Sequence, residues 1–282
     1  MKEMSAAELR EYRAKEHEKS YLLIDVRQPV EYEESHIPGS ILLPLNVFEE
    51  QVEELPEKNL IFYCRSGIRS RAAALTADFF NEAGKDIYSL EGGVLAWNGV
   101  KVKGLPSLQL FDFNKPIGDI LYDAINFEKG AFRFYEHIVR HFELKRVGIT
   151  TSFNTVIVDV MKQARDGELG HAKLIYSHLK KLTPDALPFD DVYAKSRGDI
   201  LEGGATFDEL IELIENRSDD HIIDILEIAI SMEYRAFDLY RVMSERTEEE
   251  PLKEAFYSLA QAEKSHMNTL ANALEQSVPT EA

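Results

Sequence analysis

The sequence contains a single cysteine, Cys64, among its 282 residues. A disulfide within the chain is therefore impossible, because it needs two thiols. Zinc sites built on cysteine pairs are excluded as well, and so is a rubredoxin-type iron site, which needs four thiolates. Any chemistry at Cys64 must come from one thiol.

Long apolar runs and positive charge are also scarce. The longest stretch free of Asp, Glu, Lys and Arg is fourteen residues, from Ser35 to Phe48, whereas a membrane-spanning helix needs about 20 mostly apolar residues. The sequence has 32 basic and 50 acidic residues, which gives a net charge of −18. Such a surface repels phosphate groups, so we expect neither nucleic acid nor membrane as a partner. The first twenty residues are highly charged and lack the apolar core of a secretory signal, so we expect a cytoplasmic protein.

The first hundred residues alternate short apolar runs with helical patterns. The apolar runs predict strands at Tyr21–Val26, Ser40–Leu43, Leu60–Tyr63 and Ile87–Leu90. Helical periodicity predicts helices at Ala6–Glu18 and Arg69–Asn81. Strands that alternate with helices indicate an α/β layer with a mostly parallel sheet.

The composition changes after Trp97. The glycines and prolines of residues 98–116 are typical of a linker. Beyond them, helical periodicity predicts four long helices, at 117–142, 152–182, 219–246 and 251–276. The connection 183–218 contains one short helical pattern, Phe207–Asn216. Four long helices with one long crossover fit an all-α, ferritin-like four-helix bundle. We therefore expect an α/β domain at 1–105, a linker at 106–116 and the bundle at 117–282.

Cys64 follows the apolar run Leu60–Tyr63 and begins the segment Cys64-Arg-Ser-Gly-Ile-Arg-Ser70. A thiol between a buried strand and a helix N-terminus faces free backbone N–H groups and the positive end of the helix dipole. Nearby arginines add positive charge, so the thiolate is favoured and the thiol pKa falls. A lone cysteine is more often a small buried apolar residue, but the arginines and the glycine favour a reactive thiol here.

Four segments give the first hundred residues a resemblance to a single-domain rhodanese, a sulfurtransferase. They are Asp25–Arg27 with Glu31 and Tyr32, then His36–Ser40, Cys64–Ser70 and Leu90–Trp97. The resemblance implies that Cys64 is the nucleophile, which accepts sulfane sulfur as a persulfide and passes it to a thiophilic acceptor. Thiosulfate, persulfides and thiols are the implied substrates. Asp25 and Arg27 are interpreted as structural residues.

The resemblance also assigns the binding loop. The backbone N–H groups implied to cradle the terminal sulfur are those of Arg65, Ser66, Gly67, Ile68, Arg69 and Ser70, and Arg69 is implied to close the loop. The spacing from Cys64 to Arg69 is one residue shorter than in related phosphatases, which favours sulfur over phosphate.

The second half of the chain contains an internal repeat. Two segments read E-x-x-A-F-x-x-Y, from Glu128 to Tyr135 and from Glu233 to Tyr240; two read E-x-x-H, from Glu168 to His171 and from Glu263 to His266. Each glutamate lies on the apolar stripe of its predicted helix. One E-x-x-H alone is usually part of a solvated face, but the two pairs together favour a metal site. Four buried carboxylates require cations, and two divalent ions would balance them.

Residues 117–276 resemble the ferritin-like domain of the rubrerythrin family. The resemblance implies two iron ions, with manganese as the alternative, held by Glu128, Glu168, His171, Glu233, Glu263 and His266. Tyr135 and Tyr240 would hydrogen-bond ligand carboxylates, unless they are simple core aromatics. Gly167 and Gly170 flank Glu168, and we expect them to provide access or close packing beside the metals.

The two resemblances predict a rhodanese-type sulfurtransferase fused to a di-iron peroxidase or oxidoreductase that reduces peroxide or reacts with dioxygen. Without a four-cysteine site, the electrons would come from an external donor. Bundles of this family commonly pair, so we expect a homodimer. One alternative is a bundle that stores iron or only dimerises, without redox turnover. Another is a first domain that only binds or senses an anion.

Overall fold

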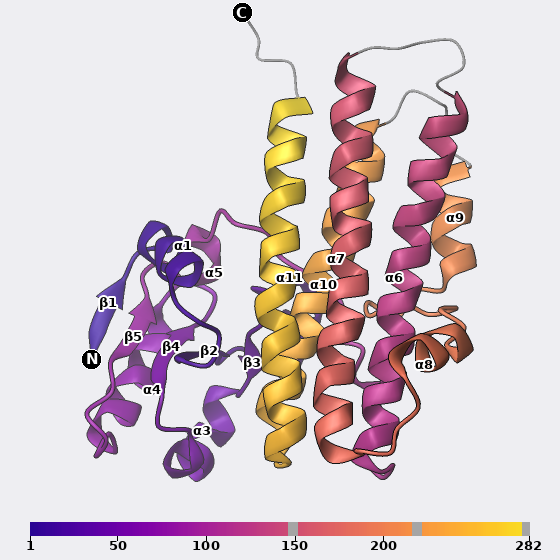
Figure 1. The fold of residues 1–282 in the computed structure, drawn as a ribbon. Coiled ribbons are helices and arrows are strands. Elements are labelled where there is room, and N and C mark those ends of the chain that lie inside the picture. Colours follow the sequence, from indigo (N-terminus) through magenta and orange to yellow (C-terminus); the bar gives the residue numbers. More distant parts are fainter. Residues whose placement is uncertain (146–151, 216–221, 278–282) are drawn as a thin grey trace, which may run out of the picture. The chain divides into compact units, whose positions relative to one another are not determined.

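The computed structural model describes residues 1–145, 152–215 and 222–277 (Figure 1). It divides into two compact units. The first comprises Met1–Pro106 with Tyr240–Arg246, and the second comprises Ser107–Leu239 with Thr247–Ala282. Within the described ranges, no helix combines the length and the apolar character needed to cross a membrane.

A five-stranded sheet, in which every strand runs parallel to its neighbours, forms the centre of the first unit. The strand order is β1 (Lys2–Met4), β5 (Ile87–Leu90), β4 (Asn59–Tyr63), β2 (Tyr21–Asp25) and β3 (Ile41–Leu42). The four predicted strands and their parallel arrangement are confirmed. The edge strand β1 has no apolar pattern that would predict it, because two of its three residues are charged.

Helices cover both faces of this sheet. One face carries α3 (Leu45–Gln51) and α4 (Ile68–Phe79), and the other carries α1 (Ala6–Lys15) and α5 (Gly93–Ala96). Consecutive residues of β2 therefore enter different cores: Leu22 packs with α3 and α4, and Leu23 packs with α1 and α5. Burial on both faces explains why the strands read as continuous apolar runs.

Shorter elements complete the first unit and its exit. They are α2 (Pro29–Glu34) and the 3-10 turns η1 (Val52–Glu54) and η2 (Leu108–Leu110). The helix α2 was not predicted because six residues are too few to show periodicity, although Pro29 occupies its first turn and Gln28 with Glu31 forms a capping box. Val102 forms an isolated antiparallel bridge with His36, so the chain stays beside the sheet domain after Trp97.

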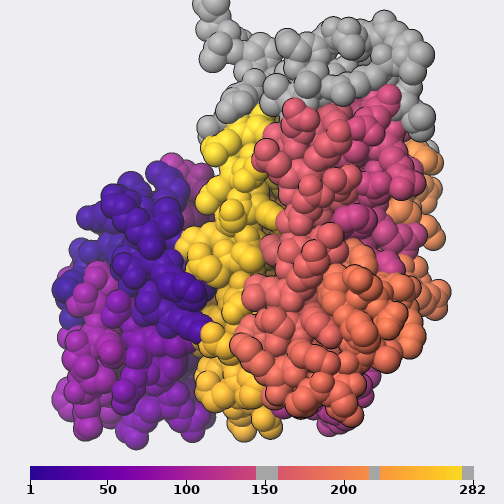
Figure 2. All heavy atoms as spheres, viewed as in Figure 1, coloured from indigo at the N-terminus to yellow at the C-terminus, as the bar shows by residue number. Residues whose placement is uncertain are grey.

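Four long helices form the bundle, and the last residues of one of them, Tyr240–Arg246, belong to the first unit. They are α6 (Ile117–Lys145), α7 (Ser152–Leu182), α10 (Ile222–Arg246) and α11 (Glu250–Ser277). Figure 2 shows α7 packed side by side with α6 and with α11. The ferritin-like bundle is thus confirmed, and its helices agree closely with the predicted ones. Residues 219–221 of the predicted third helix lie outside the described residues.

The connection from α7 to α10 carries two short helices, α8 (Phe189–Lys195) and α9 (Phe207–Glu215). The second agrees with the predicted pattern, but α8 was missed because it has only seven residues. Both helices pack against α6. Between them the chain makes a tight turn, in which the Leu201 N–H donates to the Ala205 carbonyl at 2.9 Å.

Candidate functional site

Cys64 lies directly after β4, where the chain turns into α4, and its side chain is 1% exposed. The N–H of Gly67 donates to Cys64 Sγ at 3.1 Å. Burial raises the pKa of Cys64, but hydrogen bonds from the backbone of Ser70, Ser66 and Gly67 and from the Ser70 hydroxyl outweigh it, so the pKa lies below its ordinary value. The loop is therefore built to hold a negative charge at this sulfur.

The segment after β5 fixes the orientation of the loop. The N–H groups of Val94 and Leu95 donate to the carbonyls of Cys64 and Arg65 at 2.7 and 3.1 Å. The N–H and C=O of a trans peptide point in opposite directions, so these bonds turn the following loop N–H groups the other way. Gly93 permits this approach, because a Cβ there would lie 2.3 Å from the Cys64 carbonyl oxygen.

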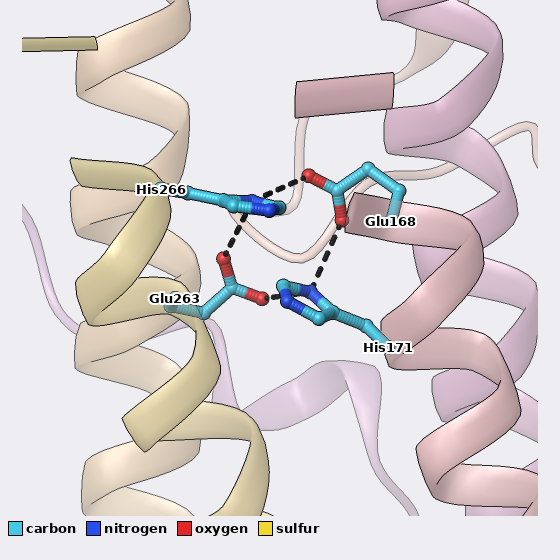
Figure 3. A group of neighbouring side chains, drawn as sticks. All are labelled: Glu168, His171, Glu263 and His266. Carbon is cyan, nitrogen blue, oxygen red and sulfur yellow. Dashed lines mark ion pairs between the residues drawn. The ribbon is translucent and has the colours of Figure 1, made fainter. Parts of the chain in front are cut away.

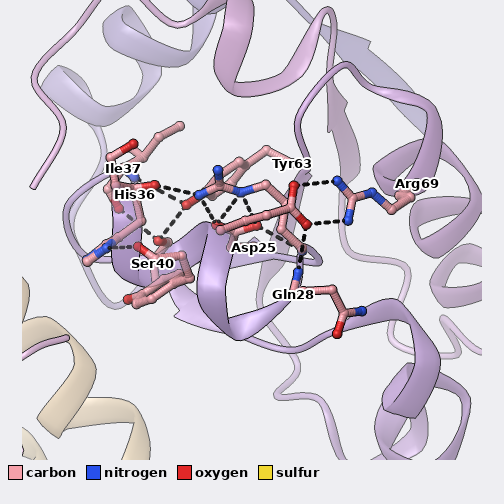
Figure 4. Close-up of polar contacts among 11 residues, drawn as sticks. Asp25, Gln28, His36, Ile37, Ser40, Tyr63 and Arg69 are labelled. Carbon is pink, nitrogen blue, oxygen red and sulfur yellow. Dashed lines mark hydrogen bonds and ion pairs between the residues drawn. The ribbon is translucent and has the colours of Figure 1, made fainter. Parts of the chain in front are cut away.

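A buried ion pair lies beside the loop (Figure 4). Arg27 donates to Asp25 through Nε, at 2.9 and 3.0 Å, and through Nη2, at 2.7 Å. Arg27 Nη2 also donates to the Ser35 carbonyl at 2.7 Å. Tyr63, the residue before the cysteine, pairs its hydroxyl with Ser40 Oγ at 2.9 Å. These contacts agree with a structural role for Asp25 and Arg27.

The predicted loop residues contribute unequally. Arg69 donates twice to Glu31, at 2.8 Å each, and this pair lowers the pKa of Glu31 to about 2. The side chains of Arg65, Ser66 and Ile68 are exposed. The hydrogen bonds that lower the pKa of the Cys64 thiol come from Ser66, Gly67 and Ser70. The Arg69 side chain instead binds Glu31 in the first turn of α2.

In the second unit, Glu168 and His171 of α7 point toward Glu263 and His266 of α11 (Figure 3). Glu168 lies with Oε2 3.4 Å from His171 Nδ1 and with Oε1 3.2 Å from His266 Nδ1. Glu263 is divided in the same way, with Oε1 2.9 Å from His171 Nδ1 and Oε2 3.7 Å from His266 Nδ1. Each of these two carboxylates thus faces both histidines.

The other two glutamates each lie beside one histidine. Glu128 Oε2 of α6 is 3.2 Å from His171 Nδ1, and Glu233 Oε2 of α10 is 3.4 Å from His266 Nδ1. The Tyr135 hydroxyl donates to the other oxygen of Glu233. The structure therefore brings the six predicted residues into one cluster with two similar halves. Tyr240 is buried on α10.

The electrostatics of this cluster fit cations. The four glutamates are at most 2% exposed. Among the described residues, no hydrogen-bond donor is aligned with either oxygen of Glu263, and His266 Nδ1 also lacks a hydrogen-bond partner. Burial alone would lower the pKa of His266, but Glu168 and Glu233 raise it to about 11. Buried carboxylates without partners are costly unless they bind metal, and carboxylate with imidazole suits iron or manganese.

The two glycines beside Glu168 differ. A Cβ at Gly167 would lie 1.9 Å from His266 Nε2, so the absence of a side chain lets the imidazole approach α7. A Cβ at Gly170 would meet no atom within 4 Å. Of the two expected roles, close packing therefore applies to Gly167, whereas the open space at Gly170 leaves access as the prediction there.

Glu202 is the acidic residue that the sequence analysis missed. It lies in the turn between α8 and α9, is 1% exposed, and has a ligand atom within 4.8 Å of those of Glu128 and Glu168. Burial, and then the charges of Glu128 and Glu168, raise its pKa well above the usual value. No periodic pattern could reveal it, because it lies on neither a helix nor a strand.

Comparisons with known proteins agree with this two-part architecture. Residues 5–99 match the family model of rhodanese-like domains, and residues 224–282 match that of rubrerythrin. Curated relatives include tRNA uridine(34) hydroxylases of Pectobacterium carotovorum, 29% identical over 115 residues, and of Yersinia pestis, 30% identical over 115 residues. Each alignment covers 37% of this chain and 32% of the relative, so the chain spans about a third of their length.

Part of this chain is also similar to proteins of known structure. A rhodanese-related protein of Thermoplasma volcanium is 30% identical, with 36% of this chain and 98% of that chain covered and a TM-score of 0.31. A rhodanese homologue of Thermus thermophilus is 28% identical, with 34% and 100% covered and a TM-score of 0.28.

Proposed function

Because the chain joins a rhodanese-like domain to a rubrerythrin domain, we propose that it combines sulfur transfer at Cys64 with two-electron redox chemistry at an iron pair in the bundle. One observation carries the redox half of this proposal: Glu168 and Glu263 each direct one oxygen to His171 and the other to His266. That arrangement suits two ions, which these four residues together with Glu128 and Glu233 would hold.

The sulfur-transfer step uses the lowered pKa of Cys64. The thiolate attacks the sulfane sulfur of thiosulfate, a bond forms between Sγ and that sulfur, and sulfite leaves with the electron pair of the broken S–S bond. The N–H groups that face Sγ stabilise the negative charge of the resulting persulfide. An acceptor thiolate then takes the outer sulfur and regenerates the Cys64 thiolate. A net charge of −18 disfavours a polyanionic acceptor, so small thiols are the proposed acceptors.

Residues of the bundle would hold the metals. Glu128 and His171 would bind one ion, Glu233 and His266 the other, and Glu168 and Glu263 both. The Tyr135 hydroxyl orients Glu233 by its hydrogen bond. When bound, a ferrous pair supplies the two electrons that reduce hydrogen peroxide, or react with dioxygen, and an external donor would restore them. The buried walls around the cluster exclude bulk water from it. We further propose a homodimeric, cytoplasmic protein.

The sulfurtransferase half is tested by transfer from thiosulfate to a small thiol or cyanide. Wild-type protein is expected to turn over, and Cys64→Ser to be inactive because a hydroxyl cannot form the persulfide. Arg10→Lys, at an exposed position of α1 outside the loop, is the control and is expected to keep the activity. A chain that binds thiosulfate without releasing sulfite would support the anion-binding alternative.

The redox half is tested by single turnover of the iron-loaded full chain under anaerobic conditions. One hydrogen peroxide is expected to oxidise two ferrous ions and yield two waters. Glu263→Gln is expected to lose this rapid consumption, whereas Glu254→Gln, on the exposed side of the same helix, keeps it. Accumulation of many irons per chain with slow peroxide consumption would instead support storage.

A further inference from the structure

The crossover between α7 and α10 is fastened to α6, the helix that carries Glu128. Asn126 Oδ1 accepts from the N–H groups of Arg197 and Gly198, at 2.7 and 3.0 Å. Lys129 Nζ donates to the Tyr193 carbonyl at 2.6 Å. These bonds come from positions on both sides of Glu128, so the crossover is held at the level of the acidic cluster.

A close backbone contact and a tight turn then fix Glu202. A Cβ at Gly130 would lie 2.5 Å from the Ile200 carbonyl oxygen, so the crossover backbone lies directly against α6 there. Ile200 and Thr206 form an isolated antiparallel bridge, and the Gly204 N–H donates to the Leu201 carbonyl at 2.8 Å. Glu202 therefore projects from a hydrogen-bonded turn.

The carboxylate of Glu202 lies beside the acidic cluster with one of its two oxygens unpaired within the described ranges. The residue is 1% exposed, and its Oε1 has no hydrogen-bond partner among the described residues. Its ligand atom lies within 4.8 Å of those of Glu128 and Glu168. The Tyr193 hydroxyl, from the same crossover, is also buried without a partner in the described part of the chain. An unpaired carboxylate oxygen beside two other carboxylates, those of Glu128 and Glu168, fits a bound cation.

We propose that Glu202 is a fifth carboxylate ligand, supplied by the crossover to the ion that Glu128 and His171 hold. This inference rests on the proposed metal pair. Glu202 groups with Glu128 and Glu168, whereas the half formed by Glu233 and His266 gains no such carboxylate among the described residues. The two ions therefore have unequal sites, and the one beside Glu202 binds more tightly.

The test compares wild type, Glu202→Gln and the matched control Glu212→Gln in the full chain, with metal-free protein titrated anaerobically with Co²⁺. Glu212 is an exposed glutamate of the same crossover. Wild type and the control are expected to bind two ions with separate affinities. Glu202→Gln is expected to weaken the tighter site by at least about tenfold, with a changed visible absorption of the bound Co²⁺, and to leave the weaker site unchanged.

Thermal unfolding of the same proteins separates a ligand from a structural residue. Glutamine keeps the size of the side chain and brings no charge to the two other carboxylates, so metal-free Glu202→Gln is expected to be at least as stable as wild type. If wild type binds two ions and Glu202→Gln shows the same two affinities and the same spectrum, Glu202 is not a ligand, although the metal pair itself stands. Wild type that binds no metal would overturn both this inference and the metal pair.

Discussion

Replacement of Gly167 by alanine is expected to displace His266 from the proposed metal site. The added Cβ would lie 1.9 Å from His266 Nε2 and 2.5 Å from Cε1. Non-bonded atoms of this kind settle at about 3.5 Å or more, so the ring must move by more than about 1 Å. A metal–nitrogen bond has a length of about 2.0–2.1 Å and tolerates a change in that length of only about 0.2 Å. The ion held by Glu233 and His266 should therefore lose at least about tenfold in affinity.

Gly170→Ala is the matched control on the same helix. Its Cβ meets nothing within 4 Å, and alanine is favoured over glycine in a helix interior by about 1 kcal/mol. Gly170→Ala should raise the free energy of unfolding by about that amount and keep both ions. Anaerobic Fe²⁺ titration with metal analysis measures binding, and thermal unfolding of the metal-free proteins measures stability. If Gly167→Ala retains folded structure and binds both ions with wild-type affinity, the packing argument is wrong.

Three further predictions follow from the site geometry. Hydrogen bonds from the loop lower the pKa of Cys64, so the pH midpoint of its alkylation by iodoacetamide should lie below about 8.5, the value of a free thiol. Ser70→Ala should raise that midpoint. An unchanged midpoint in Ser70→Ala would show that the loop does not lower the pKa. Tyr135→Phe deletes the hydrogen bond to Glu233 and should weaken iron binding about 10–100-fold, whereas Tyr176→Phe on α7 should not. Removal of iron by a chelator should lower the unfolding temperature, while Cys64-dependent sulfur transfer continues. If sulfur transfer is lost together with the iron, the two sites are not independent.

The longer regular elements were predictable from the sequence because burial leaves a pattern in it: an apolar run for a strand covered on both faces, and a helical period for a helix covered on one side. The strands β2 and β4 are buried on both faces and read as apolar runs, and the long helices place their glutamates on apolar stripes. The E-x-x-H spacing puts Glu168 and His171 on one helix face, and the structure brings that pair to Glu263 and His266.

Features that depend on tertiary contacts were not predictable. Glu202 joins the cluster through a turn held against α6, and its neighbours in sequence give no periodic pattern. The different surroundings of Gly167 and Gly170 depend on which residue of α11 lies opposite each one. Likewise, the double hydrogen bond from Arg69 to Glu31 joins residues far apart in the sequence, so the loop motif alone could not identify the partner of Arg69.

The central claim is that the bundle holds a pair of metal ions. The most direct test is to count iron per chain after anaerobic ferrous loading and desalting, for wild type, Glu168→Ala, His266→Ala and the exposed control Glu254→Ala. Wild type and the control should retain two irons per chain, whereas Glu168→Ala and His266→Ala should each retain fewer than two. Wild type without retained iron, or cluster variants that keep two ions, would contradict this claim.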